Sequence, residues 1–348
     1  MTESFKVGIS GAGTIGRVHA EAIAGLERAT VVAVAEPRED AGRAFERDFG
    51  GTWYPDFDAM LANADIDTVI IATPSGIHPA QVVRAAKAGK NIITEKPMAI
   101  TPDGLSQMLD ACEQAGVILA VIFQNRFSPD VLKVRRAIAA GLLGTPVLAN
   151  GAVYWHRTDD YYKANGGWRG TWELDGGGAL MNQAIHTVDL LQWLMGGVDS
   201  IQAHTTTLTH SIETEDIASA SFRFANGALG GITATTSADK DYPVRVEIVG
   251  TKGRVTLERN ATTLWEGESP LDDSLLTEED RALTAGWEPG EPFVLTHQRQ
   301  LRSIFDAMAA GTQPPVPGEE ARAAVDIILG IYESNRTGAR VRLEDVSE

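Results

Sequence analysis

Residues 5–16 read Phe-Lys-Val-Gly-Ile-Ser-Gly-Ala-Gly-Thr-Ile-Gly, an apolar run of strand length that leads directly into a glycine-rich turn. Apolar residues recur at helical spacing immediately afterwards, so the turn lies between a predicted strand and a predicted helix. In a G-x-G-x-x-G turn, the three glycines allow a tight bend, close approach to a pyrophosphate, and close helix–strand packing, in that order. The sequence therefore predicts a dinucleotide-binding turn formed by Gly11, Ala12, Gly13, Thr14, Ile15 and Gly16, with the phosphates at the helix N-terminus.

The first third of the chain alternates strands with helices. Further short apolar runs, rich in Val and Ile, lie at Thr30–Ala35, Thr68–Thr73, Asn91–Thr94 and Val117–Phe123. Continuous apolar character is typical of parallel strands that are buried on both faces. Helical periodicity separates these runs, so we predict an α/β fold whose residues 1–122 form a doubly wound parallel sheet, the Rossmann arrangement.

After Phe123 the pattern changes. Helical periodicity near residues 128–140 and 179–195 gives way to several extended segments joined by short turns, which favours a mostly antiparallel sheet. We therefore expect residues 123–348 to form an α+β domain with a large open sheet, broad enough to offer a face to another subunit. The late helix predicted at residues 319–334 could pack back on the first domain.

Composition excludes several classes of partner. The 348 residues include 30 basic and 47 acidic side chains, for a net charge of −17, which disfavours binding to nucleic acids and anionic membranes. No apolar run approaches the ~18–20 residues of a membrane span. The N-terminus also lacks the basic stretch and long apolar segment of a secretory signal, so we expect a cytoplasmic protein. The single cysteine, Cys112, lies on a helical apolar stripe and is expected in the core.

Between Glu266 and Glu291 the chain has nine acidic residues and one arginine. A solvated loop or insertion is the favoured interpretation, and a mobile lid over a site is the alternative.

Glu36 follows Gly16 by 20 residues, at the end of the second predicted strand. A carboxylate at this position accepts hydrogen bonds from ribose hydroxyls and repels a 2′-phosphate, which favours NAD over NADP. Arg38 is the exception to this pattern, because an arginine can pair with that phosphate; stacking on the adenine or simple exposure is the preferred interpretation.

Several segments resemble one protein family. Ala72-Thr73-Pro74-Ser75 with His78, and Glu95-Lys96-Pro97, each follow a predicted parallel strand, where doubly wound sheets bind ligands. Together with the glycine-rich turn, and with Gly176–Gly178 leading to Asn182 and His186, they resemble the glucose–fructose oxidoreductase/inositol dehydrogenase (Gfo/Idh/MocA) family. The resemblance implies a Rossmann domain, a second domain with a large open sheet, NAD or NADP, sugar or cyclitol substrates, and dimers or tetramers formed through the sheet.

The resemblance also implies roles for individual residues. Lys96 matches the catalytic lysine and His186 the histidine acid/base, whereas Asn182 stands where many members have aspartate. For cofactor binding, the matching residues are Thr73, Pro74, Ser75, His78, Glu95, Lys96 and Asn125, in addition to the glycine-rich turn, Glu36 and Arg38. For substrate binding, they are Lys96, Arg126, Asn182 and His186.

The chemistry of these side chains supports the catalytic assignments. Oxidation of a secondary alcohol requires a group that takes the hydroxyl proton and a donor that stabilises the developing alkoxide. A histidine titrates in the useful range, and a lysine near the positively charged nicotinamide has a lowered pKa. Asn182, His186 and Asp189 are spaced to share one helix face, a polar stripe in an otherwise apolar helix.

An aromatic and basic stretch, residues 154–172, precedes the three glycines. Aromatic rings beside arginines suit carbohydrate faces and hydroxyls, so Arg157, Trp168 and Arg169 are candidate substrate contacts. Subunit packing or loop anchoring is an almost equally favoured interpretation.

The leading functional hypothesis is an NAD-dependent dehydrogenase that acts on a ring hydroxyl of a sugar, sugar derivative or cyclitol. Two alternatives stay open: an enzyme that retains NAD and catalyses net non-redox glycoside cleavage or elimination, and a non-catalytic NAD-binding regulator. The seven histidines lack paired metal-ligand spacing, so no metal is predicted.

Overall fold

The computed structural model describes residues 4–285 and 292–345. Contacts divide the chain into two compact units, each considered by itself below. The first comprises Met1–Ala99, Asp103–Gln124 and Gly290–Ala321, and the second Ile100–Pro102, Asn125–Pro289 and Arg322–Glu348.

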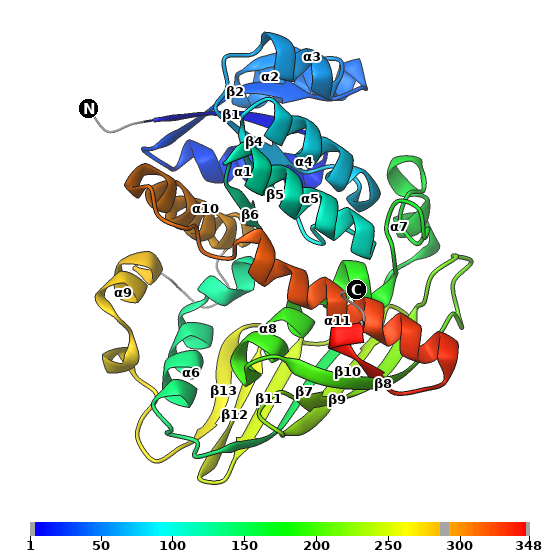
Figure 1. Ribbon diagram of the computed structural model, residues 1–348, viewed down its shortest axis with the longest axis vertical. Coiled ribbons are helices and arrows are strands. Elements are labelled where there is room, and N and C mark those ends of the chain that lie inside the picture. The colour runs from blue at the N-terminus through cyan, green and yellow to red at the C-terminus, as the bar shows by residue number, and fades with distance from the viewer. Residues whose placement is uncertain (1–3, 286–291, 346–348) are drawn as a thin grey trace. The chain divides into compact units, whose positions relative to one another are not determined.

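The first unit contains a parallel sheet of six strands in the order β3-β2-β1-β4-β5-β6. This order confirms the predicted doubly wound arrangement (Figure 1). The strands are β1 (Phe5–Ser10), β2 (Ala29–Ala35), β3 (Thr52–Tyr54), β4 (Thr68–Ile71), β5 (Asn91–Thr94) and β6 (Leu119–Val121). The helices are α1 (Thr14–Ala24), α2 (Glu39–Phe49), α3 (Phe57–Asn63), the short η1 (Ser75–Ile77), α4 (His78–Lys87) and α5 (Pro102–Ala115).

A helix from late in the chain completes the core of this unit. Helix α10 (Phe293–Ala310) packs beside α1 (Figure 1). Its Leu301, Ile304 and Phe305 are almost fully buried, and the Phe305 ring stacks on Phe5 with 5.4 Å between centroids. The first unit therefore contains a segment far beyond residue 122, the boundary expected from the sequence, because the apolar stripe of α10 is buried against β1 and α1.

The second unit contains an eight-stranded sheet in the order β13-β12-β11-β7-β10-β9-β8-β14. Neighbouring strands are antiparallel except β7 and β10, which confirms the mostly antiparallel sheet. The strands are β7 (Pro146–Tyr154), β8 (Val198–Thr206), β9 (Ile217–Phe224), β10 (Leu229–Thr235), β11 (Arg245–Gly250), β12 (Gly253–Glu258), β13 (Ala261–Glu266) and β14 (Val341–Arg342).

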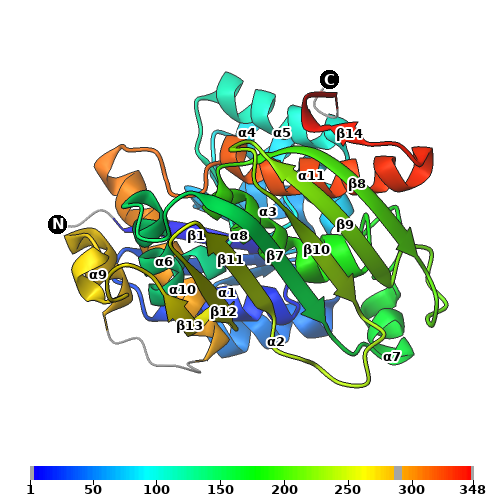
Figure 2. The ribbon, with the colours of Figure 1, turned by 90° about the horizontal axis from the view of Figure 1, so that it is seen from below.

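Helices of the second unit cover one face of its sheet. Figure 2 looks onto the other, open face, with α8 (Ile185–Met195) behind the strands. Gly151 of β7 makes room for α8, since a Cβ there would lie 2.7 Å from Thr187. The other helices are η2 (Gln124–Phe127), α6 (Pro129–Ala139), α7 (Asp159–Lys163), η3 (Ala164–Gly166), η4 (Ala179–Ala184), η5 (Asp273–Leu275), α9 (Glu278–Thr284), α11 (Gly318–Thr337) and η6 (Leu343–Asp345).

The acidic stretch after Glu266 is partly ordered against α6. Asp280 of α9 forms an ion pair with Arg136 at 2.8 Å, and Asp273 forms one with Lys133 at 2.9 Å. Most of the described residues between 267 and 285 are exposed, and two of the acids pair with basic residues of α6. Residues 286–291 lie outside the described part of the chain.

Cys112 is buried, as expected for a core position. No helix within residues 4–285 and 292–345 combines the length and apolar character needed to cross a membrane.

Candidate active site

The glycine-rich turn follows β1 and opens α1. Gly11 has a φ of +102°, and a Cβ there would lie 2.5 Å from the carbonyl oxygen of Ala72. A Cβ on Gly16 would lie 2.0 Å from the oxygen of Gly11, so helix and turn are in close contact. The geometry at both positions agrees with the predicted roles of a tight bend and close packing.

Gly13 differs from the other two glycines, because a Cβ there would meet no protein atom within 4 Å. It is also the N-cap of α1 and supplies no side chain to cap the first N–H groups of the helix. An open cradle in front of uncapped N–H groups suits the pyrophosphate of a dinucleotide. The residues from Gly11 to Gly16 therefore fit such a cofactor.

Glu36 ties the turn to the end of β2. One carboxylate oxygen accepts the N–H of Ala12 at 3.0 Å, and the other accepts Nε of Arg38 at 2.9 Å. Burial acts to raise the pKa of Glu36, but these hydrogen bonds outweigh it and lower the pKa. Arg38 is thus engaged with Glu36, and the carboxylate stays ionised at the edge where a ribose would bind.

His78 links two loops at the carboxyl ends of β4 and β5. Its ring is fully buried, and its two nitrogens lie 2.9 Å from the carbonyl oxygens of Thr73 and Pro97. Burial lowers the pKa of His78, whereas hydrogen bonds to these carbonyls favour the protonated ring. The structure therefore does not support a direct contact of His78 with the cofactor, because the imidazole is occupied in holding the Thr73 loop against Pro97.

Other cofactor candidates surround these loops. Thr73 and Pro74 are half-buried, and the Thr73 hydroxyl donates to Gln81 at 3.0 Å. Ser75 is buried, and Asn125 is half-buried in η2 of the second unit. Lys96 is half-buried after β5, and its backbone N–H donates to the buried Glu95 carboxylate at 3.2 Å.

In the second unit, three glycines precede the helix that carries Asn182 and His186. A Cβ on Gly177 would lie 2.1 Å from the hydroxyl of Tyr332, and one on Gly178 would lie 2.0 Å from the carbonyl oxygen of Glu215. The Glu215 side chain accepts N–H groups of Gly178 and Leu180 at 3.1 and 2.8 Å, so it caps the start of the helix. The chain can approach Tyr332 and Glu215 this closely only without side chains at these positions.

Asn182 lies in η4, a π-helical segment that continues into α8. Its amide nitrogen donates to the buried Asp175 at 2.6 Å, and its amide oxygen accepts Nε2 of Gln183 at 3.0 Å. These two contacts fix the orientation of the amide. His186 follows in the first turn of α8, half-buried like Asn182.

Arg126 has a different role from the substrate contact predicted for it. Its guanidinium is 3% exposed and binds both carboxylate oxygens of Asp189, at 2.7 and 2.5 Å. It also lies 5.0 Å from the ring centroid of Trp193, whose other neighbour is Arg135 at 3.7 Å. Buried ions need such complete pairing, so Asp189 belongs to this pair rather than to a polar stripe shared with His186.

The aromatic stretch places two arginines against aromatic rings. Arg157 lies 4.8 Å from the ring of Trp155, and Arg169 lies 4.8 Å from that of Trp168. The Arg157 guanidinium also donates twice to Gln183, at 3.2 and 2.9 Å, and Gln183 donates to Asn182. Arg157 is thereby connected through Gln183 to the start of the helix that carries His186.

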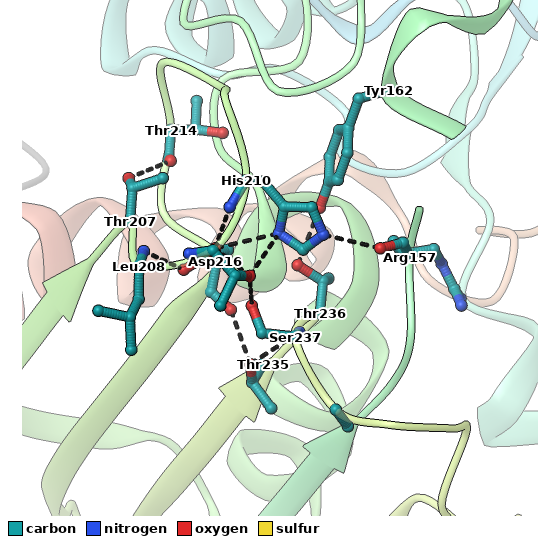
Figure 3. Close-up of polar contacts among 12 residues, drawn as sticks. Arg157, Tyr162, Thr207, Leu208, His210, Thr214, Asp216, Thr235, Thr236 and Ser237 are labelled. Atoms are coloured by element: carbon teal, nitrogen blue, oxygen red, sulfur yellow. Dashed lines mark hydrogen bonds and ion pairs between the residues drawn. The ribbon is translucent and has the colours of Figure 1, made fainter. Parts of the chain in front are cut away.

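A second network holds the backbone of Arg157 (Figure 3). Nε2 of His210 lies 2.7 Å from the carbonyl oxygen of Arg157, and Nδ1 lies 3.0 Å from a carboxylate oxygen of Asp216. Asp216 also accepts the N–H groups of Leu208 and Thr209 at 2.8 and 2.9 Å. Although burial opposes it, these hydrogen bonds lower the pKa of Asp216 to about 2.

Within the described residues, one buried group of side chains brings three potential metal ligands within 4.8 Å of one another: His19, Glu95 and His297. Spacing along the sequence did not indicate this group, because His297 comes from α10, far along the chain from the other two.

Comparisons with known proteins identify the family. Residues 5–123 match the model of an oxidoreductase family with an NAD-binding Rossmann fold, and residues 131–256 match the Gfo/Idh/MocA C-terminal domain. A crystal structure of the WlbA dehydrogenase from Bordetella pertussis, in complex with NADH and UDP-GlcNAcA, is 34% identical with a TM-score of 0.90, covering 98% of each chain. The chain belongs to the Gfo/Idh/MocA family.

Two curated relatives illustrate this family. Myo-inositol 2-dehydrogenase from Thermotoga maritima is 26% identical, over 98% of this chain and 99% of that protein. Levoglucosan dehydrogenase from Pseudarthrobacter phenanthrenivorans is 27% identical over 73% of each. This Gfo/Idh/MocA protein is accordingly an NAD-binding oxidoreductase.

Sequence reasoning missed four acidic or polar residues that hold the candidate site: Asp175, Gln183, Glu215 and Asp216. Gln183 contacts the adjacent Asn182 and the distant Arg157, and the other three contact residues on other turns or strands, so only the folded chain reveals these contacts.

We predict that replacing glycines of the turn separates binding from folding. Gly13→Ala places a methyl group in open space, so the fold should persist while the Kd for NADH rises at least about tenfold. Gly16→Ala would bring a Cβ against the oxygen of Gly11 and should lower Tm. Calorimetry and NADH titration distinguish the two; unchanged NADH affinity in Gly13→Ala would show that the pyrophosphate does not lie there.

Glu215 should make stability depend on pH. Burial raises its pKa to about 7, against the opposing effect of hydrogen bonds from Leu180 and Gly178. The raised pKa therefore adds ~3 kcal/mol to the free energy of unfolding at pH values below the ordinary glutamate pKa. This contribution is lost as the pH rises through about 7.

Denaturant unfolding at pH 5 and pH 8 measures this effect. Glu215→Gln should remove that part of the pH dependence, whereas Glu213→Gln, an exposed neighbour, should not. Equal pH dependence in wild type and Glu215→Gln would contradict the assignment.

Proposed function

We propose that this protein is an NAD-dependent dehydrogenase that transfers a hydride between the nicotinamide and a secondary ring hydroxyl of a sugar, sugar derivative or cyclitol. The observation that carries the proposal is the polar start of the η4–α8 helix. There Asn182 is held between Asp175 and Gln183, and His186 follows in the first turn of α8. Polar side chains that converge at the start of one helix can orient a small polar substrate.

Names of relatives support the substrate class. The relatives include dehydrogenases of myo-inositol and levoglucosan, and the similar WlbA structure contains UDP-GlcNAcA. These ligands share a ring that carries several hydroxyl groups. The hydrogen-bonding side chains near His186 suit such a ring.

We assign His186 as the base for the substrate hydroxyl. Because Nδ1 of His186 is buried, Nε2 is the nitrogen assigned to accept the proton. Lys96 donates a hydrogen bond to the same oxygen, and its charge lowers the hydroxyl pKa. Bound NAD supplies the hydride acceptor. Asn182, fixed by its two neighbours, orients the substrate.

Arg157, Trp168 and Arg169 form the proposed substrate wall. The guanidinium of Arg157 is fixed by Gln183 and by an ion pair with Asp241 at 3.2 Å, and its backbone is fixed by His210, so it offers rigid N–H donors beside aromatic rings. This arrangement supports contacts with ring hydroxyls or with an acidic substituent of the sugar.

A substrate screen tests the proposal. NADH absorbance is followed with inositols, anhydrosugars, monosaccharides, sugar acids and nucleotide sugars. NADH formation with a ring polyol supports the dehydrogenase. NAD that stays bound through purification, with substrate conversion but no net NADH, would support the net non-redox alternative, and NADH binding with no conversion at all would support a regulator.

For the substrate found, we predict that His186→Ala and Lys96→Ala each reduce kcat by about 100-fold or more, with NADH affinity within a few-fold of wild type. Steady-state kinetics and NADH titration measure both effects. His156→Ala, at an exposed histidine, is the control. Near-normal kcat in His186→Ala would place the base elsewhere.

We also propose that two copies pair through the open face of the eight-stranded sheet. Leu229 and Leu148 are register partners on β10 and β7, 52% and 39% exposed, beside a hollow of about 310 Å³. Exposed apolar surface on a sheet is typical of an interface.

Light scattering after gel filtration tests this interface. Leu229→Lys should dissociate an oligomer, whereas Leu208→Lys, at a more exposed leucine in a loop, should leave it intact. A monomeric wild-type protein would contradict the proposal.

A further inference from the structure

Three side chains of the aromatic stretch form a group of hydrogen-bond donors, here called the donor cluster: Tyr161, Trp168 and Arg169. Tyr161 belongs to α7, the other two follow η3, and all three side chains are half-buried. Cζ of Arg169 lies 4.7 Å from the ring centroid of Tyr161 and 4.8 Å from that of Trp168. Two aromatic rings therefore hold the guanidinium in place.

The hydroxyl of Tyr161 keeps its own hydrogen for donation. Oε1 of Gln183 accepts two N–H groups of Arg157, and because a guanidinium only donates, this contact fixes the orientation of the Gln183 amide. Nε2 of Gln183 then donates to the Tyr161 oxygen at 2.8 Å and to Oδ1 of Asn182 at 3.0 Å. The tyrosine oxygen is thus an acceptor here, and no described residue accepts its O–H.

Trp168 and Arg169 offer donors as well. Across residues 4–285 and 292–345, neither the indole N–H of Trp168 nor the guanidinium of Arg169 has a hydrogen-bond or ion-pair partner. Arg157 is different, because its Nη1 lies 3.2 Å from a carboxylate oxygen of Asp241 and its Nη2 donates to Gln183 at 2.9 Å. A carboxylate of the protein already balances the charge of Arg157, whereas Arg169 has no such partner in the described chain.

Asp175 fixes the donor cluster relative to Asn182. One of its carboxylate oxygens accepts the Asn182 amide at 2.6 Å, and the other accepts the backbone N–H of Gly170, which directly follows Arg169, at 2.8 Å. The tyrosine of the cluster is joined to the same asparagine through the glutamine described above. Two separate sets of hydrogen bonds therefore connect the donor cluster to the residue that is proposed to orient the substrate.

Donors without acceptors favour a ligand group that accepts hydrogen bonds and donates none. A ring hydroxyl is a poor match, because it also donates, and the nearby amide oxygens of Gln183 and Asn182 already accept protein N–H groups. A carboxylate only accepts, and its two oxygens match the paired N–H groups of a guanidinium. Its single negative charge also equals the single positive charge of Arg169.

We propose that the donor cluster binds the carboxylate of an acidic sugar, and that Arg169 is the residue that selects acidic over neutral rings. This inference deepens the proposed function and rests on it, because the ring that carries the carboxylate is the ring proposed to be oxidised. Arg169 forms a bidentate ion pair with the carboxylate, and the Tyr161 hydroxyl donates to the same group.

Binding to the NADH-loaded protein tests the proposal without turnover, because an alcohol cannot pass a hydride to a cofactor that is already reduced. The probes are pairs that differ only at the sixth carbon: D-glucuronate and D-glucose, D-galacturonate and D-galactose, and the UDP conjugates of the first pair. In at least one pair, calorimetry should give a Kd about 100-fold or more lower for the acid than for the neutral sugar.

Variants of the donor cluster identify the residue responsible. Arg169→Met keeps an apolar side chain between the two rings but removes the donors and the charge. The Kd for the acid should rise about 30-fold or more, while that for the neutral sugar stays within about twofold. Arg169→Lys keeps the charge without the planar fork and should recover part of the preference. Tyr161→Phe should weaken binding of the acid several-fold.

Two controls separate this role from a general effect of arginine. Arg84→Met is matched, since Arg84 also lies over an aromatic ring, 5.5 Å from the centroid of Phe57, but in the first unit; it should keep the wild-type preference. The double variant Arg157→Met/Asp241→Asn removes a balanced ion pair and should keep most of the preference. Tm and the Kd for NADH, measured for every variant, establish that it folds.

Four outcomes would overturn the inference. They are equal affinity for both members of every pair, failure of every acid to bind, an acid preference that persists in Arg169→Met, and tighter binding of D-glucose 6-phosphate than of D-glucuronate. Oxidation of a neutral ring polyol without any preference for acids would refute this inference and leave the proposed function intact. Binding of an acid that depends on Arg169, without oxidation of any sugar, would refute the proposed function alone.

Discussion

The close approach of the backbone at Gly11 to the carbonyl of Ala72 is the constraint on which the nucleotide-binding unit depends. A Cβ added at Gly11 would lie only 2.5 Å from this carbonyl oxygen, which leaves no room for a side chain. The ends of β1 and β4 can therefore meet only at a glycine. Because the strands are parallel, the turn, the Thr73 loop and the Glu95–Lys96 segment all lie at one edge of the sheet. His78 and Glu95 fix these loops with hydrogen bonds to their backbones.

The second unit uses the same principle at its helix start. Gly178 allows the backbone of Glu215 to approach, and the Glu215 carboxylate caps the segment that contains Asn182. Asp175 and Gln183 then fix the Asn182 amide, while Asp216 and His210 fix Arg157. Asn182 and Arg157, which are proposed to contact the substrate, are thus held by residues that are not. Because these two side chains are already fixed, less entropy is lost when the substrate binds.

The sequence allowed prediction of elements whose signal is local. The glycine-rich turn, the parallel strands and the Glu95-Lys96-Pro97 segment each depend on a few consecutive residues. Strand β7 was not predicted, because Asn150 and Gly151 interrupt its apolar pattern; the structure explains the glycine by the contact with α8. The position of α10 in the first unit, and the partners of Arg126 and His210, depend on contacts between distant segments. One sequence does not encode these contacts in any local pattern.

The contact between Asn182 and Asp175 restricts how this candidate site can evolve. A carboxylate at position 182 would face the Asp175 carboxylate across the present 2.6 Å hydrogen bond, and one of the two acids would have to keep a proton. Position 182 can therefore become acidic at low cost only if position 175 loses its charge. The two positions should behave as a coupled pair in double-mutant cycles and should vary together among descendants of this chain.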